Sequence, residues 1–329
     1  MTAPETQLEQ PHSMTSLLHR TVQILKFLVP AVIAFFIGRT IYRNWREVRE
    51  ANWAFDGGYL LLSILLTVGW FALRPYVWAA ILGRFGHPIR YGAAFRIFRQ
   101  AELSRYVPGA VWQYVSRVYL ASRWGVPAAA TMAATIVETV LLILASILPA
   151  LLNIREALPR LEGIQQVLLF AFPVVALVVV HPRVLNLWAG FLARRMQQPY
   201  TELRIGWGSL AGVWFTYSVM WLVVGLGVGL FVRGVISIPL NDVPRVGSYY
   251  AAAWFIGIVS VVAPAGMGIR EGAFGLLLAQ AMPLGAALTI AVGVRLWMTL
   301  LELLWAGVGL WFFDAPSPHF SPPEDRSAS

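Results

Sequence analysis

Long apolar stretches without any ionisable side chain are the feature that most limits the folds open to this chain. No Asp, Glu, Lys or Arg occurs in residues 205–232, 246–269 or 272–294. A helix of about 20 apolar residues crosses the hydrocarbon core of a bilayer, whereas a soluble domain interrupts such runs with charges. Only 12% of the 329 residues are charged and mean hydropathy is +0.66. We therefore expect an all-α, polytopic membrane bundle.

Apolar runs of sufficient length predict about six crossing helices in a multi-pass protein of the cell inner (plasma) membrane. We expect residues 21–312 to form one transmembrane domain. A polar cytoplasmic N-terminus over residues 1–20 would precede it, and a disordered tail rich in Pro and Ser over 313–329 would follow it. The predicted spans lie near residues 21–38, 58–83, 127–150, 164–181, 207–232 and 285–312.

Two further segments are too charged or too broken to be simple spans, yet too apolar to be loops. Residues 93–120 are interrupted by Pro108 and Gly109, and residues 249–280 are interrupted by the breaker cluster at 263–268. Each pattern predicts a helix, a sharp break at membrane depth and a second helix, which is a re-entrant pair. Paired broken helices in corresponding halves are typical of transporters with an inverted repeat.

Charge and residue usage exclude several classes of function. The formal net charge is +9, but no soluble basic domain is present to bind nucleic acid, so we assign most of the excess to loops on the cytoplasmic side. The absence of cysteine excludes disulfides, thiol nucleophiles and CxxC sites. Metalloprotease, serine hydrolase and nucleotide-binding motifs do not occur. We expect neither a metal nor a cofactor, and no enzymatic activity.

Ionisable residues within or beside the predicted spans each require a physical reason, because burying a charge in a bilayer costs about 2.5–3.5 kcal/mol. Buried ion pairs that fix helix register are one interpretation, and a polar cavity with arginines available to a substrate is the other. Arg74 precedes Pro75 and is most simply explained by snorkelling or a kink. The full set is Arg74, Arg96, Arg99, Glu102, Arg105, Arg117, Glu138, Arg270, Glu271, Arg295 and Glu302.

The breaks and the arginines together predict a site for a phosphate-bearing ligand. Guanidinium groups bind phosphate bidentately, helix N-termini offer unpaired N–H groups, and glycine permits close approach to the backbone. The candidate substrate-binding residues are Arg105, Pro108, Gly109, Arg117, Gly266, Gly268 and Arg270. A surrounding charge network would consist of Glu138, Glu271, Arg295 and Glu302.

Three stretches of sequence carry a resemblance to a known family. LSRYVPGAVWQYVSRVYLASRWGVP, ATIVETVLLIL and VVAPAGMGIREGAFGLLL resemble the lysylphosphatidylglycerol synthase transmembrane (flippase-like) family over roughly residues 20–312. The family pattern is a Pro-Gly turn, a downstream Arg, a membrane Glu and a second turn with an Arg-Glu pair. It is met at Pro108 with Gly109, Arg117, Glu138 and residues 264–271.

The resemblance implies a function and also marks departures. Family members fused to a soluble aminoacyltransferase domain make and flip aminoacylated phosphatidylglycerol, and free-standing members are regarded as lipid translocases, so no synthase activity is expected here. Many relatives carry a Glu just after the first Pro-Gly, where this chain has Trp112 and Gln113, and the second turn contains Ala265.

We therefore expect a flippase for an anionic phospholipid or lipid-linked headgroup. The alternatives are a membrane-embedded enzyme acting on a lipid headgroup or polyprenyl carrier, and an accessory subunit of a cell-envelope lipid pathway. The sequence is also compatible with a homo-oligomer.

Overall fold

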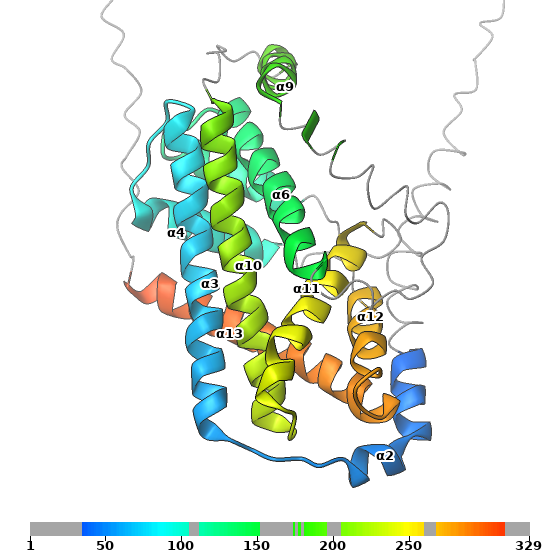
Figure 1. The fold of residues 1–329 in the computed structure, drawn as a ribbon. Coiled ribbons are helices and arrows are strands. Elements are labelled where there is room, and N and C mark those ends of the chain that lie inside the picture. The colour runs from blue at the N-terminus through cyan, green and yellow to red at the C-terminus, as the bar shows by residue number, and fades with distance from the viewer. Residues whose placement is uncertain are drawn as a thin grey trace, which may run out of the picture.

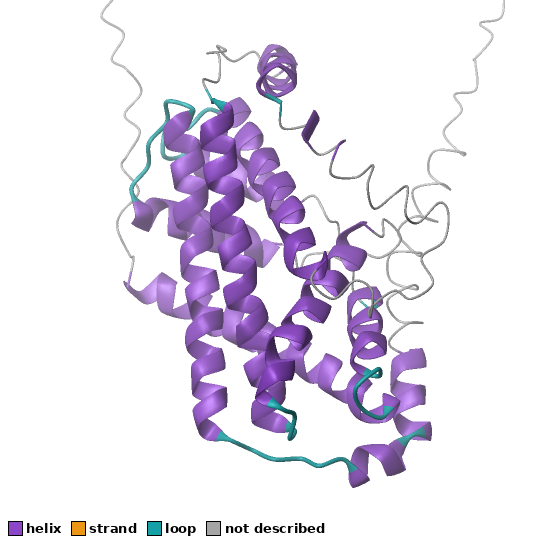
Figure 2. Cartoon of the chain, in the orientation of Figure 1, coloured by secondary structure: helices purple, strands orange, loops and turns teal. Residues whose placement is uncertain are grey.

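The structure is a computed structural model that describes residues 35–104, 112–151, 181–195, 205–259 and 268–312, together with positions 174, 177 and 178. Within these residues the secondary structure is helical, and a single antiparallel bridge joins Trp53 to Ile236 (Figures 1 and 2). The helices are α2 (Trp45–Glu50), α3 (Gly57–Arg84), α4 (Tyr91–Leu103), α5 (Trp112–Ser122), α6 (Ala128–Leu151), α9 (Pro182–Arg195), α10 (Trp207–Val235), α11 (Val243–Val259), α12 (Ile269–Leu278) and α13 (Leu284–Phe312).

Among the described residues, four helices are long and apolar enough to cross a membrane: α3, α6, α10 and α13. They confirm the spans predicted near 58–83, 127–150, 207–232 and 285–312. The predicted spans near 21–38 and 164–181 fall largely outside the described residues, so a total of six crossings is not confirmed. The predicted N-terminus over 1–20 and the tail over 313–329 also lie outside them.

The chain order of the helices repeats. A long helix, α3, is followed by the short helices α4 and α5 and then by the long helix α6. In the second half α10 is followed by α11 and α12 and then by α13. The members of each short pair pack against each other. The breaks predicted between them lie largely in residues 105–111 and 260–267, outside the described part, and re-entrant insertion stays a prediction.

Helix α10 is the centre of the bundle and packs against α3, α6 and α11 (Figure 1). Glycine permits its close crossing with α11, because a Cβ atom on Gly247 would lie 2.6 Å from the backbone of Gly225. The buried Trp221 on the same helix donates its indole N–H to the carbonyl of Leu142 in α6, at 2.9 Å. The ring of Trp221 also lies 5.1 Å from that of Trp70 in α3.

Local sequence explains where helix α3 starts and why one of its carbonyl groups lacks a helical partner. Asp56 caps α3 by accepting hydrogen bonds from the N–H groups of Gly58 and Tyr59, at 2.8 and 3.2 Å. Pro75 lies inside α3 and has no N–H, so it cannot bond to the carbonyl of Phe71 one turn earlier. That carbonyl becomes part of the site described next.

Candidate functional site

Five ionisable side chains from the four helices of the first half meet in one place, which we call the first cluster: Arg74, Arg99, Glu102, Arg117 and Glu138. Arg74 donates to Oε1 of Glu102 at 2.5 Å and to Oε1 of Glu138 at 2.9 Å. Arg99 donates to Oε2 of Glu102 at 2.9 Å, and Arg117 donates to Oε2 of Glu138. Each carboxylate oxygen therefore accepts from an arginine, and the formal charges of the five sum to +1.

The side chains of the first cluster are largely buried from solvent. Its carboxylates are 5% and 2% exposed, and Arg99 is 2% exposed. The guanidinium groups of Arg74 and Arg117 lie over the ring of Phe98, at 4.8 and 4.2 Å from its centroid. Arg99 also donates to the carbonyl of Phe71, which Pro75 leaves without its helical partner. Buried charges with this degree of pairing act first as a structural lock.

The first cluster lies at a common depth. Tyr217 of α10 is buried beside this cluster and interacts electrostatically with Arg74 and Glu138. Arg74 is ten residues from the helix end at Arg84, Glu138 is ten from Ala128, and Tyr217 is ten from Trp207. These three ends lie at the same end of the bundle (Figure 1). At 1.5 Å per residue the depth is about 15 Å, which is half the thickness of a hydrocarbon core of about 30 Å.

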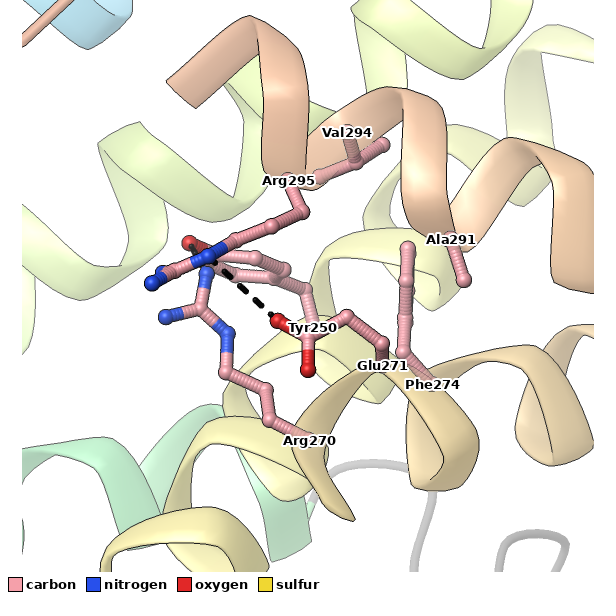
Figure 3. Close-up of a pocket in the computed structure, with 7 residues that line it drawn as sticks. All are labelled: Tyr250, Arg270, Glu271, Phe274, Ala291, Val294 and Arg295. Carbon is pink, nitrogen blue, oxygen red and sulfur yellow. Dashed lines mark hydrogen bonds and ion pairs between the residues drawn. The ribbon is translucent and has the colours of Figure 1, made fainter. Parts of the chain in front are cut away.

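A second cluster lies in the other half, on α11, α12 and α13. A small open hollow, with an interior volume of about 10 Å³ and so room for about one water molecule, is lined by Tyr250, Arg270, Glu271, Phe274, Ala291, Val294 and Arg295. Arg270 donates to the hydroxyl oxygen of Tyr250 at 2.6 Å. In Figure 3 the side chains of Arg270 and Arg295 reach toward each other from α12 and α13. The hollow combines two guanidinium groups with an apolar wall.

Glu271 has two roles in the second cluster. Its Oε2 accepts the N–H of Gly268 at 2.6 Å, which caps α12, and its Oε1 lies 3.5 Å from Nε of Arg295. Gly268 has a φ of +82°, a conformation that glycine adopts without strain. The side chains of Glu271 and Arg295 are 11% and 25% exposed. The formal charges of Arg270, Glu271 and Arg295 sum to +1.

Aromatic side chains separate the two clusters. The guanidinium of Arg74 lies 6.0 Å from the ring of Trp70, which packs against Trp221. Trp221 in turn lies 6.4 Å from Tyr250, and the guanidinium of Arg270 lies 4.9 Å from the ring of Tyr250. The path from one cluster to the other therefore runs through tilted aromatic rings of α3, α10 and α11.

The structure places the predicted site residues in separate groups. Arg117 and Glu138 belong to the first cluster, whereas Gly268, Arg270, Glu271 and Arg295 belong to the second. Glu302 is buried on α13, with 4% of its surface exposed. Arg105, Pro108, Gly109 and Gly266 lie outside the described residues.

Three residues at the centre of these clusters were not among the predicted site residues. Arg74 bridges two carboxylates that lie 28 and 64 positions away in sequence. Glu102 joins Arg74 to Arg99, and the sequence indicates only that it is one of the charges in or beside a span that require a physical reason. Tyr250 lies in a charge-free run, where no sequence signal separates it from core tyrosines. The available signal for Arg74 was the energetic cost of an arginine inside a span.

Among the described residues, no group of three or more His, Cys, Asp and Glu side chains could hold a metal ion.

Of the comparisons with known proteins, one found a match. No curated protein and no solved structure matches the chain. A family model described as the lysylphosphatidylglycerol synthase TM region matches residues 23–306, which confirms the resemblance seen in the sequence. The chain therefore belongs to the lysylphosphatidylglycerol synthase TM region family.

Proposed function

We propose that this protein is a translocase that moves an anionic phospholipid or lipid-linked headgroup between leaflets of the inner membrane without altering it covalently. Family membership supports a role in lipid or headgroup metabolism or translocation. The observation that carries the proposal is the open hollow of the second cluster, where two arginines face an apolar wall inside a bundle of membrane-spanning helices.

The hollow has the chemistry that a phosphate group requires. Arg270 and Arg295 supply planar guanidinium groups, which stay protonated and bind phosphate oxygens in pairs. The oxygen of Tyr250 accepts from Arg270, so the phenol O–H is directed to another acceptor. A phosphate oxygen beside Arg270 would be that acceptor. Phe274, Ala291 and Val294 would contact the apolar part of the lipid.

In this proposal Glu271 acts as an internal anion that the headgroup replaces. Its contact with Arg295 is long, at 3.5 Å, and it is partly exposed to solvent. An arriving phosphate would compete with Glu271 for Arg295, while Glu271 would keep its bond to the N–H of Gly268. Departure of the phosphate would restore the pair. A carboxylate in this position limits affinity, which lets the lipid leave.

The first cluster would supply the other half of the cycle. In the present conformation Glu138 and Glu102 hold Arg74, Arg99 and Arg117 in a closed lattice of ion pairs. We infer that Arg117, with Arg105, receives the headgroup when that lattice opens and that α4 with α5 and α11 with α12 act as re-entrant pairs. Glu302 and Arg295 would complete the network that rearranges between the two states.

Purified protein in liposomes tests the proposal directly. We expect it to accelerate leaflet exchange of a fluorescently labelled phosphatidylglycerol, and Arg270→Gln to slow that exchange at least about tenfold. The matched control is Arg46→Gln, which removes an exposed arginine paired with Glu50 on α2 and leaves exchange unchanged. Exchange no faster than in empty liposomes would overturn the proposal. Recovery of a covalently altered lipid would instead indicate the enzyme.

A further inference from the structure

Helix α9 presents an exposed face that neither cluster uses. Leu187, Trp188 and Phe191 are 70%, 63% and 47% exposed. Exposed arginines flank these apolar side chains, with Arg183 at the start of the helix and Arg194 and Arg195 in its last turn. At about 100° per residue the six side chains occupy roughly 140° of the helix circumference.

The opposite face of α9 fixes the helix to the bundle. Leu185, Ala189 and Ala193 are 2%, 4% and 0% exposed, and α9 packs against α6. In Figure 1 α9 is viewed along its axis, whereas α3, α6 and α10 run along the page. The helix therefore lies crosswise to the spans, at the bundle end where α3 ends and α6 and α10 begin. That is the orientation of a helix in the plane of a membrane surface.

We infer that the exposed face of α9 is a docking surface for anionic phospholipid in the leaflet at this end of the bundle. Leu187, Trp188 and Phe191 would enter the boundary between headgroups and acyl chains, where burial of apolar area is favourable. The arginines at both ends would bind headgroup phosphates. No Asp or Glu occurs in α9, so no negative side chain of this helix offsets the positive charge of its arginines.

Contacts within the face agree with this partner. The guanidinium of Arg195 lies 5.8 Å from the ring of Phe191, and the rings of Trp188 and Phe191 lie edge to face at 6.2 Å. Arginine held over an aromatic ring keeps its charge at the level of that ring, as a residue at the headgroup boundary requires. The surface is separate from the second cluster, and its lipid binding does not depend on the proposed translocation.

The absence of cysteine from the chain makes the test specific, since Leu187→Cys creates a single labelling site. A nitroxide label there, in full-length protein reconstituted into phosphatidylcholine and phosphatidylglycerol vesicles, should be more accessible to oxygen than to a polar nickel chelate. A fluorophore at the same position should transfer energy to trace acceptor-labelled phosphatidylglycerol as if that lipid were enriched roughly fivefold over acceptor-labelled phosphatidylcholine.

Two controls separate the inference from general lipid contact. Leu304→Cys on α13, whose native side chain is 57% exposed, should show no preference between the two lipids. Replacement of Arg183, Arg194 and Arg195 by Gln should abolish the preference at residue 187 and leave the label at residue 304 unchanged. A label at residue 187 open to the nickel chelate, a label shielded from both reagents by protein, or equal transfer to both lipids would each overturn the inference.

Discussion

The two halves of the bundle use the same helix order but hold their charges differently. In the first half, all four carboxylate oxygens of Glu102 and Glu138 accept from arginines, and these glutamates are almost fully buried. In the second half, Glu271 divides its oxygens between a backbone N–H and a long contact with Arg295, while Arg270 donates to the hydroxyl oxygen of Tyr250.

Formal charge alone does not distinguish the two clusters, because the charges of each sum to +1. Pairing and solvent access separate them. A buried lattice with every carboxylate oxygen used mainly fixes how α3, α4, α5 and α6 sit together. In the second cluster the side chains of Glu271 and Arg295 are partly exposed and border a hollow. The first half therefore holds its charges in a closed lattice of ion pairs, and the second half contains the hollow on which the proposed function rests.

The largest expected effect is on the lock. Glu138→Gln would leave Arg74 and Arg117 without their shared carboxylate and should lower the free energy of unfolding by about 3–5 kcal/mol. Chemical denaturation in detergent measures the change. Glu271→Gln is the matched control and should cost less than about 1 kcal/mol, because its pair is longer and partly exposed. Adding Arg117→Met to Glu138→Gln should recover part of the loss. Equal losses of unfolding free energy at the two glutamates would mean that the ion pairs of the first cluster stabilise the fold no more than those of the second.

The next effect concerns geometry at the open site. Arg270→Lys keeps the positive charge but replaces a planar fork by a point charge, so it should slow leaflet exchange by about tenfold. The free energy of unfolding should remain within about 1 kcal/mol of that of the wild type, since Arg270 is bound to Tyr250 rather than to a buried carboxylate. Exchange at the wild-type rate would mean that charge alone suffices there.

Sequence reasoning predicted the long helices well and the partners of the charges poorly. A charge-free apolar run specifies a span by itself, as residues 205–232 do, nearly all of which lie in α10. The role of Arg74 depends on carboxylates of α4 and α6, and nothing in the residues beside Pro75 indicates those partners. The interpretation of the membrane charges as buried ion pairs fits the first half, and arginines available to a substrate stay a prediction for the second.

A smaller effect should follow from removing one hydroxyl. Tyr250→Phe keeps the ring over Arg270 and its packing against Trp221, but it removes the acceptor for Arg270 and the proposed donor to phosphate. The loss of about 1 kcal/mol corresponds to an approximately fivefold slower exchange. Tyr217→Phe, beside the first cluster, is the matched control. Its rate of leaflet exchange should stay within about twofold of that of the wild type. A larger loss at Tyr217 would move the site toward the first half.

The smallest effect should have the opposite sign and sharpens the role of Glu271. If this carboxylate competes with the headgroup for Arg295, then Glu271→Gln should bind a soluble phosphate ester more tightly. Glycerol phosphate should inhibit leaflet exchange at a concentration about threefold lower than in the wild type, the change expected for a partly exposed ion pair. Inhibition should weaken again when Arg295→Gln is added, because the arginine released by the first substitution is then absent. Unchanged inhibition in Glu271→Gln would show that the carboxylate caps α12 and takes no part in exchange.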